Sequence, residues 1–237
     1  MKVDIWSDVR CPFCYIGKRK FEKALQHFEN KDQVEVEWHS FELDPYLKTD
    51  TNTTNYEHLA AAKGITPEEA REMSEHVISY GAGTGIDFHF EKVVVANSFK
   101  AHKVIQLAQL EKKGTEAEEL LFKAYFTEGK NIDDDNVLSE IGKALQLDVK
   151  EFERIIRSND SEIDYAVIRD EQDAGKLKIQ GVPFFVFNDK YAVSGAQQPS
   201  VFAQVLDRSW KEFSERQKPN PQIIEEGKSC STDGNCD

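Results

Sequence analysis

The chain has 237 residues, of which 39% are hydrophobic and 31% are charged, so it can form one large domain or a domain with a sizeable insertion. The formal net charge of −13 argues against nucleic acid and anionic membranes as partners, because both are themselves negatively charged. No apolar run approaches the roughly 18 residues that a membrane-spanning helix needs.

The N-terminal segment is expected to fold as a strand, a helix and a second strand. Residues 3–6 suit a short strand, and residues 12–28 repeat apolar side chains at helical spacing, with Pro12 in the first turn. Residues 34–38 alternate apolar and acidic side chains, which is typical of a strand with one solvent-facing side. Because Asp4 interrupts any apolar signal core, we expect no export leader and a cytoplasmic location.

The middle of the chain has a helical pattern from residue 51 to residue 159. Thr66 and Pro67 form a helix start, with acidic residues in the first turn. Further amphipathic stretches cover residues 98–112, 116–126, 135–145 and 149–158. We therefore predict that this segment is all helical.

The C-terminal part is expected to add a helix, two strands and a last helix. After a helix at residues 162–177, Pro183 precedes a continuous apolar run at residues 184–187, which predicts a strand buried on both faces. A turn, a short returning strand at residues 191–193 and a core helix at residues 202–213 follow.

Removing the helical segment leaves the order βαββα of the thioredoxin core, in which the second strand lies at a sheet edge and the third is central. We therefore predict an α/β protein, a thioredoxin fold with an inserted all-helical domain. The predicted boundaries are residues 1–50 and 160–217 for the discontinuous thioredoxin-like domain, 51–159 for the insertion and 218–237 for a flexible tail.

The four cysteines form two close pairs, Cys11 with Cys14 and Cys230 with Cys236. At the start of a helix, free N–H groups and the helix dipole stabilise a thiolate on the first cysteine. Cys11 would then attack a substrate disulfide, and Cys14 would resolve the mixed disulfide. The alternatives are half of a zinc site, which would need a second nearby pair of ligands, or structural cysteines in the core.

The dipeptide of Val182 and Pro183 is the second signal for this chemistry. In the thioredoxin fold the loop before the third strand carries a cis proline that faces the active cysteines. The plain alternative is a proline that begins a strand. Together with the C-x-x-C motif and the strand order, the cis interpretation is favoured. Arg10 could add positive potential beside Cys11.

Several segments resemble those of DsbA-like proteins of the FrnE type, which are thioredoxin-superfamily oxidoreductases. They are SDVRCPFCYIG (7–17), WHSFELDP (38–45), NSFKAH (97–102), AYFTEG (124–129), GVPFF (181–185) and SGAQ (194–197). The resemblance extends to about residue 215. It implies a thioredoxin fold with an inserted helical domain and dithiol–disulfide oxidase or isomerase activity.

Two rival functions remain open at this point. Kappa-class glutathione transferases and 2-hydroxychromene-2-carboxylate isomerases resemble this architecture but have serine where Cys11 stands. A zinc-holding, redox-regulated binding module is the other rival.

Periplasmic DsbA has the motif C-P-H-C, whereas Phe13 stands here in place of its histidine. Because a phenyl ring cannot stabilise the thiolate as an imidazole can, we predict a weaker oxidant, suited to isomerase or reductase activity.

Other polar residues are weaker candidates. His102, beside Asn97 in one of the family segments, could face the active-site groove or could pack locally. His39 and Glu42, at the end of the second strand, could pass protons to Cys14, although such residues are more often simply solvated. Asp8 could cap the following turn or act on a proton.

The tail pair, Cys230 and Cys236, is either a secondary redox pair that relays electrons to the motif or part of a dispensable tail, with transient zinc binding as a third alternative. We expect no cofactor and no resident metal, although glutathione could serve as a redox substrate. The expected partners are disulfide-containing or unfolded proteins.

Overall fold

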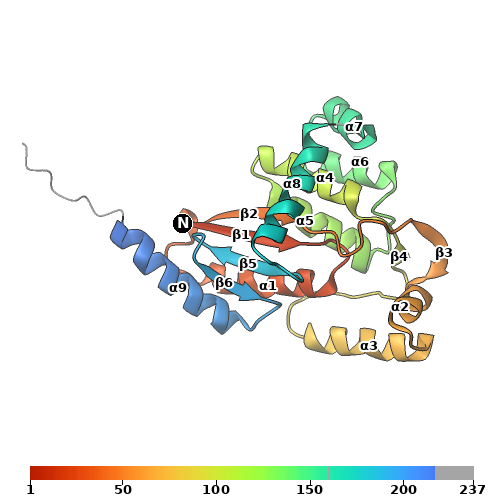
Figure 1. The fold of residues 1–237 in the computed structure, drawn as a ribbon, viewed down its shortest axis with the longest axis horizontal. Coiled ribbons are helices and arrows are strands. Elements are labelled where there is room, and N and C mark those ends of the chain that lie inside the picture. Colours follow the sequence, from red (N-terminus) through yellow and green to blue (C-terminus); the bar gives the residue numbers. More distant parts are fainter. Residues whose placement is uncertain (160, 217–237) are drawn as a thin grey trace, which may run out of the picture.

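A four-stranded sheet forms the centre of the computed structural model, which describes residues 1–159 and 161–216 (Figure 1). Its strands are β1 (Lys2–Ser7), β2 (Glu35–Ser40), β5 (Phe184–Phe187) and β6 (Tyr191–Ser194), in the order β2-β1-β5-β6. β1 runs parallel to β2 and antiparallel to β5, and β6 is antiparallel to β5. The second strand therefore lies at an edge and the third is central, which confirms the predicted strand placement.

Helices cover both faces of this sheet. α1 (Pro12–Gln26) and α9 (Pro199–Arg216) pack on one face, and α8 (Glu162–Lys176) lies on the other. On the first face the ring of Phe21 contacts the rings of Phe185 and Phe202, at centroid distances of 5.6 and 5.7 Å. On the second face Phe184 is only half-buried. The prediction that β5 is buried on both faces is therefore wrong for one face, because α8 does not cover all of that strand.

The segment between β2 and α8 is inserted into the thioredoxin order. It contains α2 (Asn55–Lys63), α3 (Pro67–Tyr80), α4 (Phe99–Leu110), α5 (Gly114–Phe122), α6 (Asp135–Ala144) and α7 (Val149–Arg157). It also contains two strands, β3 (Asp50–Thr54) and β4 (Val94–Val95), which pair antiparallel. The prediction of an all-helical insertion is therefore wrong in this detail. Threonines favour strand at β3, but the pairing joins segments about 40 residues apart, which no local pattern reveals.

One helix boundary also differs from expectation. The predicted helix at residues 116–126 ends at Phe122, where the chain turns into a π-helical stretch, Lys123–Thr127. Such π-turns inside helices occur frequently at functional sites. A single 3-10 turn, Lys31–Gln33, precedes β2.

The insertion is joined to the edge of the sheet at β2. The side-chain amide of Gln109 in α4 accepts a hydrogen bond from the Trp38 N–H at 2.5 Å and donates one to the Trp38 carbonyl at 2.8 Å. The indole N–H of Trp38 donates to Thr115 at 3.0 Å. Free backbone groups of an edge strand invite pairing with other chains, so these bonds protect the edge while they fix the insertion in place. Among the described helices, none is long and apolar enough to cross a membrane.

Candidate active site

The Cys11–Cys14 pair lies at the N-terminus of α1, where β1 delivers the chain. Cys11 is the N-cap residue, and Pro12 occupies the first helical position as predicted. The Cys14 N–H donates to the Cys11 carbonyl at 3.0 Å, so the first turn brings the two residues together. Both are free thiols, with 5% of Cys11 and 1% of Cys14 exposed. The outer thiol is thus the one that a substrate can reach.

The loop before β5 lies directly beside the outer thiol. The peptide bond between Val182 and Pro183 is cis, as the sequence predicts, and the Cys11 thiol donates to the Val182 carbonyl at 3.6 Å. Gly17 makes this approach of α1 to the loop feasible. A Cβ at position 17 would lie 2.9 Å from Pro183 Cγ and 3.4 Å from the ring of Phe185. The local sequence does not reveal this requirement for glycine.

A largely apolar groove of about 600 Å³ runs from Cys11 between α1 and the insertion. Phe13 contributes one side, and Leu59 of α2 with Met73 and Val77 of α3 contribute the other. Phe126 in the π-helical turn forms another part of the lining. Phe13 is 40% exposed, so an aromatic surface stands beside the reactive cysteine.

Arg10 also lines the groove, next to Tyr125 of the π-helical turn. Burial raises the pKa of Tyr125 to about 12, although the adjacent Arg10 guanidinium acts to lower it. Two buried nitrogens of Arg10, Nε and Nη1, have no hydrogen-bond partner among the described residues. Arg10 therefore lies in the groove lining together with Cys11.

The inner thiol lies in a strongly desolvated position. Burial raises the pKa of the Cys14 thiol well above its ordinary value, and the adjacent Cys11 raises it further. The Ser7 hydroxyl at the end of β1 acts in the opposite direction. Cys14 is consequently a protonated thiol in the reduced protein, and it must lose its proton before it can attack a disulfide.

Asp8 and His102 form a buried ion pair behind the motif. His102 Nε2 lies 3.6 Å from Asp8 Oδ1, and both side chains are at most 1% exposed. Burial acts to lower the pKa of His102, but Asp8 raises it above its ordinary value. Asp8 also accepts hydrogen bonds from the N–H groups of Arg10 at 3.0 Å and Leu43 at 2.8 Å. Asp8 therefore caps the turn into the motif, and His102 lies behind the motif rather than in the groove.

Asn97 has a local structural role. Its side-chain N–H donates to the Leu47 carbonyl at 3.1 Å, and its carbonyl accepts from the Phe99 N–H at 2.8 Å. The residue fixes the start of α4 and the loop after β2, and it does not line the groove.

The hypothesis that His39 passes protons to Cys14 is wrong. Its two ring nitrogens lie 2.8 Å from Asp4 Oδ1 and 2.8 Å from Asp170 Oδ1, so neither is free. Glu42, the other candidate at this strand end, faces Asp8 and His102 instead, and burial raises its pKa to about 7.

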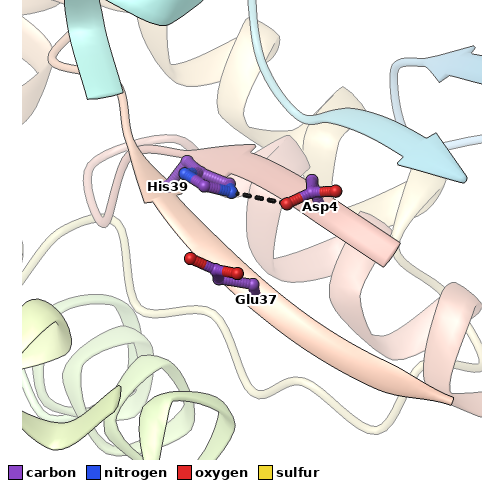
Figure 2. A group of neighbouring side chains, drawn as sticks. All are labelled: Asp4, Glu37 and His39. Carbon is purple, nitrogen blue, oxygen red and sulfur yellow. Dashed lines mark hydrogen bonds and ion pairs between the residues drawn. The ribbon is translucent and has the colours of Figure 1, made fainter. Parts of the chain in front are cut away.

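His39 also belongs to a group of side chains spaced closely enough to hold a metal ion. Figure 2 shows Asp4 of β1 beside Glu37 and His39 of β2, with ligand atoms within 4.8 Å of one another. The Lys2 ammonium lies 2.8 Å from Asp4 and 2.6 Å from Glu37. Because lysine and histidine already neutralise the carboxylates, we interpret this group as an ion-pair network and assign no metal to it.

Two further buried polar groups near the motif were not predicted from the sequence. Ser7 and Glu118 are both buried, Ser7 acts on the pKa of Cys14 and on that of Glu118, and Glu118 comes from α5 of the insertion. No local motif marks either residue, because their proximity depends on how the insertion docks. Cys230 and Cys236 lie outside the described residues.

Known proteins share this architecture. The chain matches the DSBA-like thioredoxin domain over residues 2–207. It superposes on a probable DsbA oxidoreductase from Streptomyces coelicolor with a TM-score of 0.82 and 32% identity, covering 100% of this chain and 98% of the other. An uncharacterized protein of Bacillus subtilis, YwbO, is 25% identical over 88% of this chain and 97% of its own length.

A third similarity concerns the fold alone. The cytosolic disulfide reductase DsbM from Pseudomonas aeruginosa, solved with GSH, has a TM-score of 0.58 and 14% identity, covering 89% of this chain and 100% of the other. The match over residues 2–207 and the 32% identity decide the assignment. The chain belongs to the DSBA-like thioredoxin domain family.

Proposed function

We propose that this protein is a thiol–disulfide oxidoreductase that acts on protein disulfides through Cys11 and Cys14. The Cys11 thiolate attacks one sulfur of a substrate disulfide, and the other substrate sulfur leaves as a thiolate. Cys14 then attacks Cys11, which releases the second substrate thiol and leaves a Cys11–Cys14 disulfide. Two electrons pass from the protein to the substrate, and the reverse sequence oxidises a substrate dithiol.

The observation that carries this proposal is the relation between Cys11 and the Val182–Pro183 loop. The thiol lies 3.6 Å from the Val182 carbonyl, at the one end of the motif that opens into the groove. A substrate strand beside this loop would present its sulfur to Cys11. The apolar groove wall, with the exposed ring of Phe13, suits unfolded segments, whose apolar side chains are still exposed.

We further propose that the protein works as an isomerase or reductase in the cytoplasm. Phe13 replaces the histidine of the strongly oxidising C-P-H-C motif, and reducing conditions favour the dithiol state. The similarity to a cytosolic reductase solved with GSH supports glutathione as a reducing substrate. The assignment to the FrnE type remains part of this proposal.

Thiol exchange with insulin and with scrambled ribonuclease tests the proposal. Wild type should reduce insulin and refold scrambled ribonuclease, and Cys11→Ser should abolish both activities. Cys14→Ser should accumulate a mixed disulfide, detectable by mass spectrometry after acid quenching. The Cys230→Ser/Cys236→Ser double variant separates the contribution of the tail pair. Full activity of Cys11→Ser would refute the proposal.

The same protein preparations discriminate the rival functions. A glutathione-dependent transferase would conjugate an aromatic electrophile with glutathione at a rate that Cys14→Ser leaves unchanged. A zinc-holding module would contain stoichiometric zinc in the purified, reduced state. Activity on protein disulfides with neither property supports the oxidoreductase.

A further inference from the structure

The inner thiol presents a chemical problem that the motif alone does not solve. Cys14 is 1% exposed, and solvent therefore cannot remove its proton directly. The attack of Cys14 on a mixed disulfide nevertheless requires the thiolate. A base must lie inside the protein on the side of Cys14 that faces away from the groove.

Five charged or titratable groups besides Cys14 meet behind the motif, and three of them, Asp8, His102 and Lys18, cannot act as that base. Asp8 accepts hydrogen bonds from two backbone N–H groups and pairs with His102. These contacts lower the pKa of Asp8 despite its burial, so its carboxylate is a weak base. Asp8 raises the pKa of His102 despite its burial, which favours the charged imidazolium, and an imidazolium has no lone pair with which to accept a proton. Lys18 is a cation whose ammonium lies 2.6 Å from Glu22 and 2.8 Å from Glu119.

Two carboxyl groups remain. Glu42 faces Asp8 and His102, whereas Glu118 lies beside the Ser7 hydroxyl, which also acts on Cys14. Glu118 is therefore the candidate base. It projects from α5 into the same buried region, and 1% of it is exposed. Its Oε2 atom has no hydrogen-bond partner among the described residues. The groups facing it are His102 from α4, Lys18 from α1, and Asp8 and Ser7 from the end of β1.

Ser7 connects this carboxyl group to the thiol. Its hydroxyl is fully buried and lies close enough to influence the pKa of Cys14 and the pKa of Glu118, lowering both. The hydroxyl completes no hydrogen bond with the described residues in the resting geometry, so it is free to rotate towards either group. A hydroxyl can accept a proton on one side while it donates one on the other.

We infer that Glu118 exchanges the proton of Cys14 through the Ser7 hydroxyl during resolution of the mixed disulfide. The inference rests on the proposed oxidoreductase function and assigns part of its chemistry to the insertion. As Cys14 Sγ bonds to Cys11 Sγ, the bond from Cys11 to the substrate sulfur breaks, and the substrate leaves as a thiolate with the bonding electrons. The Cys14 proton passes to Ser7, and the Ser7 proton passes to Glu118.

The acidity of Glu118 suits exchange in both directions. Burial raises the pKa of this carboxyl group to about 8, although the charges of His102 and Lys18 act to lower it. A group that titrates near the working pH can accept a proton when the disulfide forms and return it when the disulfide is reduced.

A coloured aromatic disulfide reagent separates the two chemical steps. In the Cys230→Ser/Cys236→Ser background, reduced protein should release one aromatic thiolate as Cys11 attacks and a second as Cys14 resolves the mixed disulfide. Stopped-flow absorbance records the two releases of aromatic thiolate as a fast and a slow phase. The Cys14→Ser variant has no resolving cysteine, so it should show the first phase alone and thereby identify it. The first phase tests the proposed function, and the second tests the role of Glu118.

Glu118→Gln should slow the second phase about a hundredfold near neutral pH and leave the first phase within about twofold. The wild-type second phase should show an inflection near pH 8, whereas Glu118→Gln should rise in proportion to hydroxide without it. Ser7→Ala should slow the same phase, and combining the two substitutions should add little, because the two groups act in one path. Glu116→Gln, on the exposed side of α5, is the matched control.

Circular dichroism establishes that each variant is folded. A second phase in Glu118→Gln that equals wild type at every pH would overturn the inference and leave the oxidoreductase function standing. If wild type shows no first phase, the proposed function itself fails.

Discussion

The ion pairs of His39 should make the stability of the protein depend on pH in a defined window. Burial acts to lower the pKa of His39, but the hydrogen bonds to Asp170 and Asp4 outweigh it and raise the pKa from 6.5 to about 9. Each pH unit between these values is worth about 1.4 kcal/mol, so the charged histidine contributes about 3 kcal/mol. Because the folded-state pKa is raised, this contribution is complete below about pH 6.5 and is lost as the pH rises to about 9.

Urea unfolding of wild type and His39→Gln across this pH range checks the calculation. The difference between their free energies of unfolding should be largest at about pH 6 and should shrink by about 3 kcal/mol towards pH 9.5, since titrations common to both proteins cancel. His76→Gln removes an exposed histidine from α3 and should show no such pH-dependent difference. A wild-type to His39→Gln difference that stays constant with pH would refute the reasoning.

Three substitutions around the motif have equally definite expectations. Gly17→Ala places a methyl group 2.9 Å from Pro183 Cγ, so it should slow insulin reduction about tenfold or more, whereas Gly175→Ala, with open space around it, should leave the rate unchanged. Phe13→His should make the protein a stronger oxidant, seen as more dithiol form at equilibrium in a glutathione buffer; an unchanged ratio would contradict this. Asp8→Asn breaks a buried ion pair and should lower the free energy of unfolding in urea by about 3 kcal/mol; wild-type stability would show that the pair contributes little.

The thioredoxin core could be predicted because its signals are local. A strand that leads into C-x-x-C at a helix start, followed by an alternating strand, is visible within the first 40 residues. The apolar run after Pro183 likewise marks the third strand, and the cis bond before Pro183 follows from the fold. These features depend on side-chain periodicity and on proline chemistry, both of which can be seen in short windows.

The remaining features depend on contacts between distant parts of the chain. His39 looked like a solvated strand-end residue or a proton carrier because Asp170, the residue that fixes its ring, is 131 positions away. Glu118 carries no motif, and nothing in its local sequence distinguishes it from the exposed Glu116 on the same helix. The π-helical turn after Phe122 follows from tertiary packing, since its apolar spacing is equally compatible with a continuous α-helix.

Two adjacent acidic residues of α5, Glu118 and Glu119, have different roles. Together they explain how an inserted segment can take part in the chemistry of the core. Glu119 accepts hydrogen bonds from Tyr15 at 2.8 Å, Arg19 at 2.5 Å and Lys18 at 2.8 Å, all on α1. These bonds hold α5 against the helix that carries the cysteines. Residues adjacent on a helix point about 100° apart, so fixing Glu119 on the outside turns Glu118 into the buried region behind the motif. The insertion is therefore part of the active site, and its docking onto α1 sets the geometry of proton exchange.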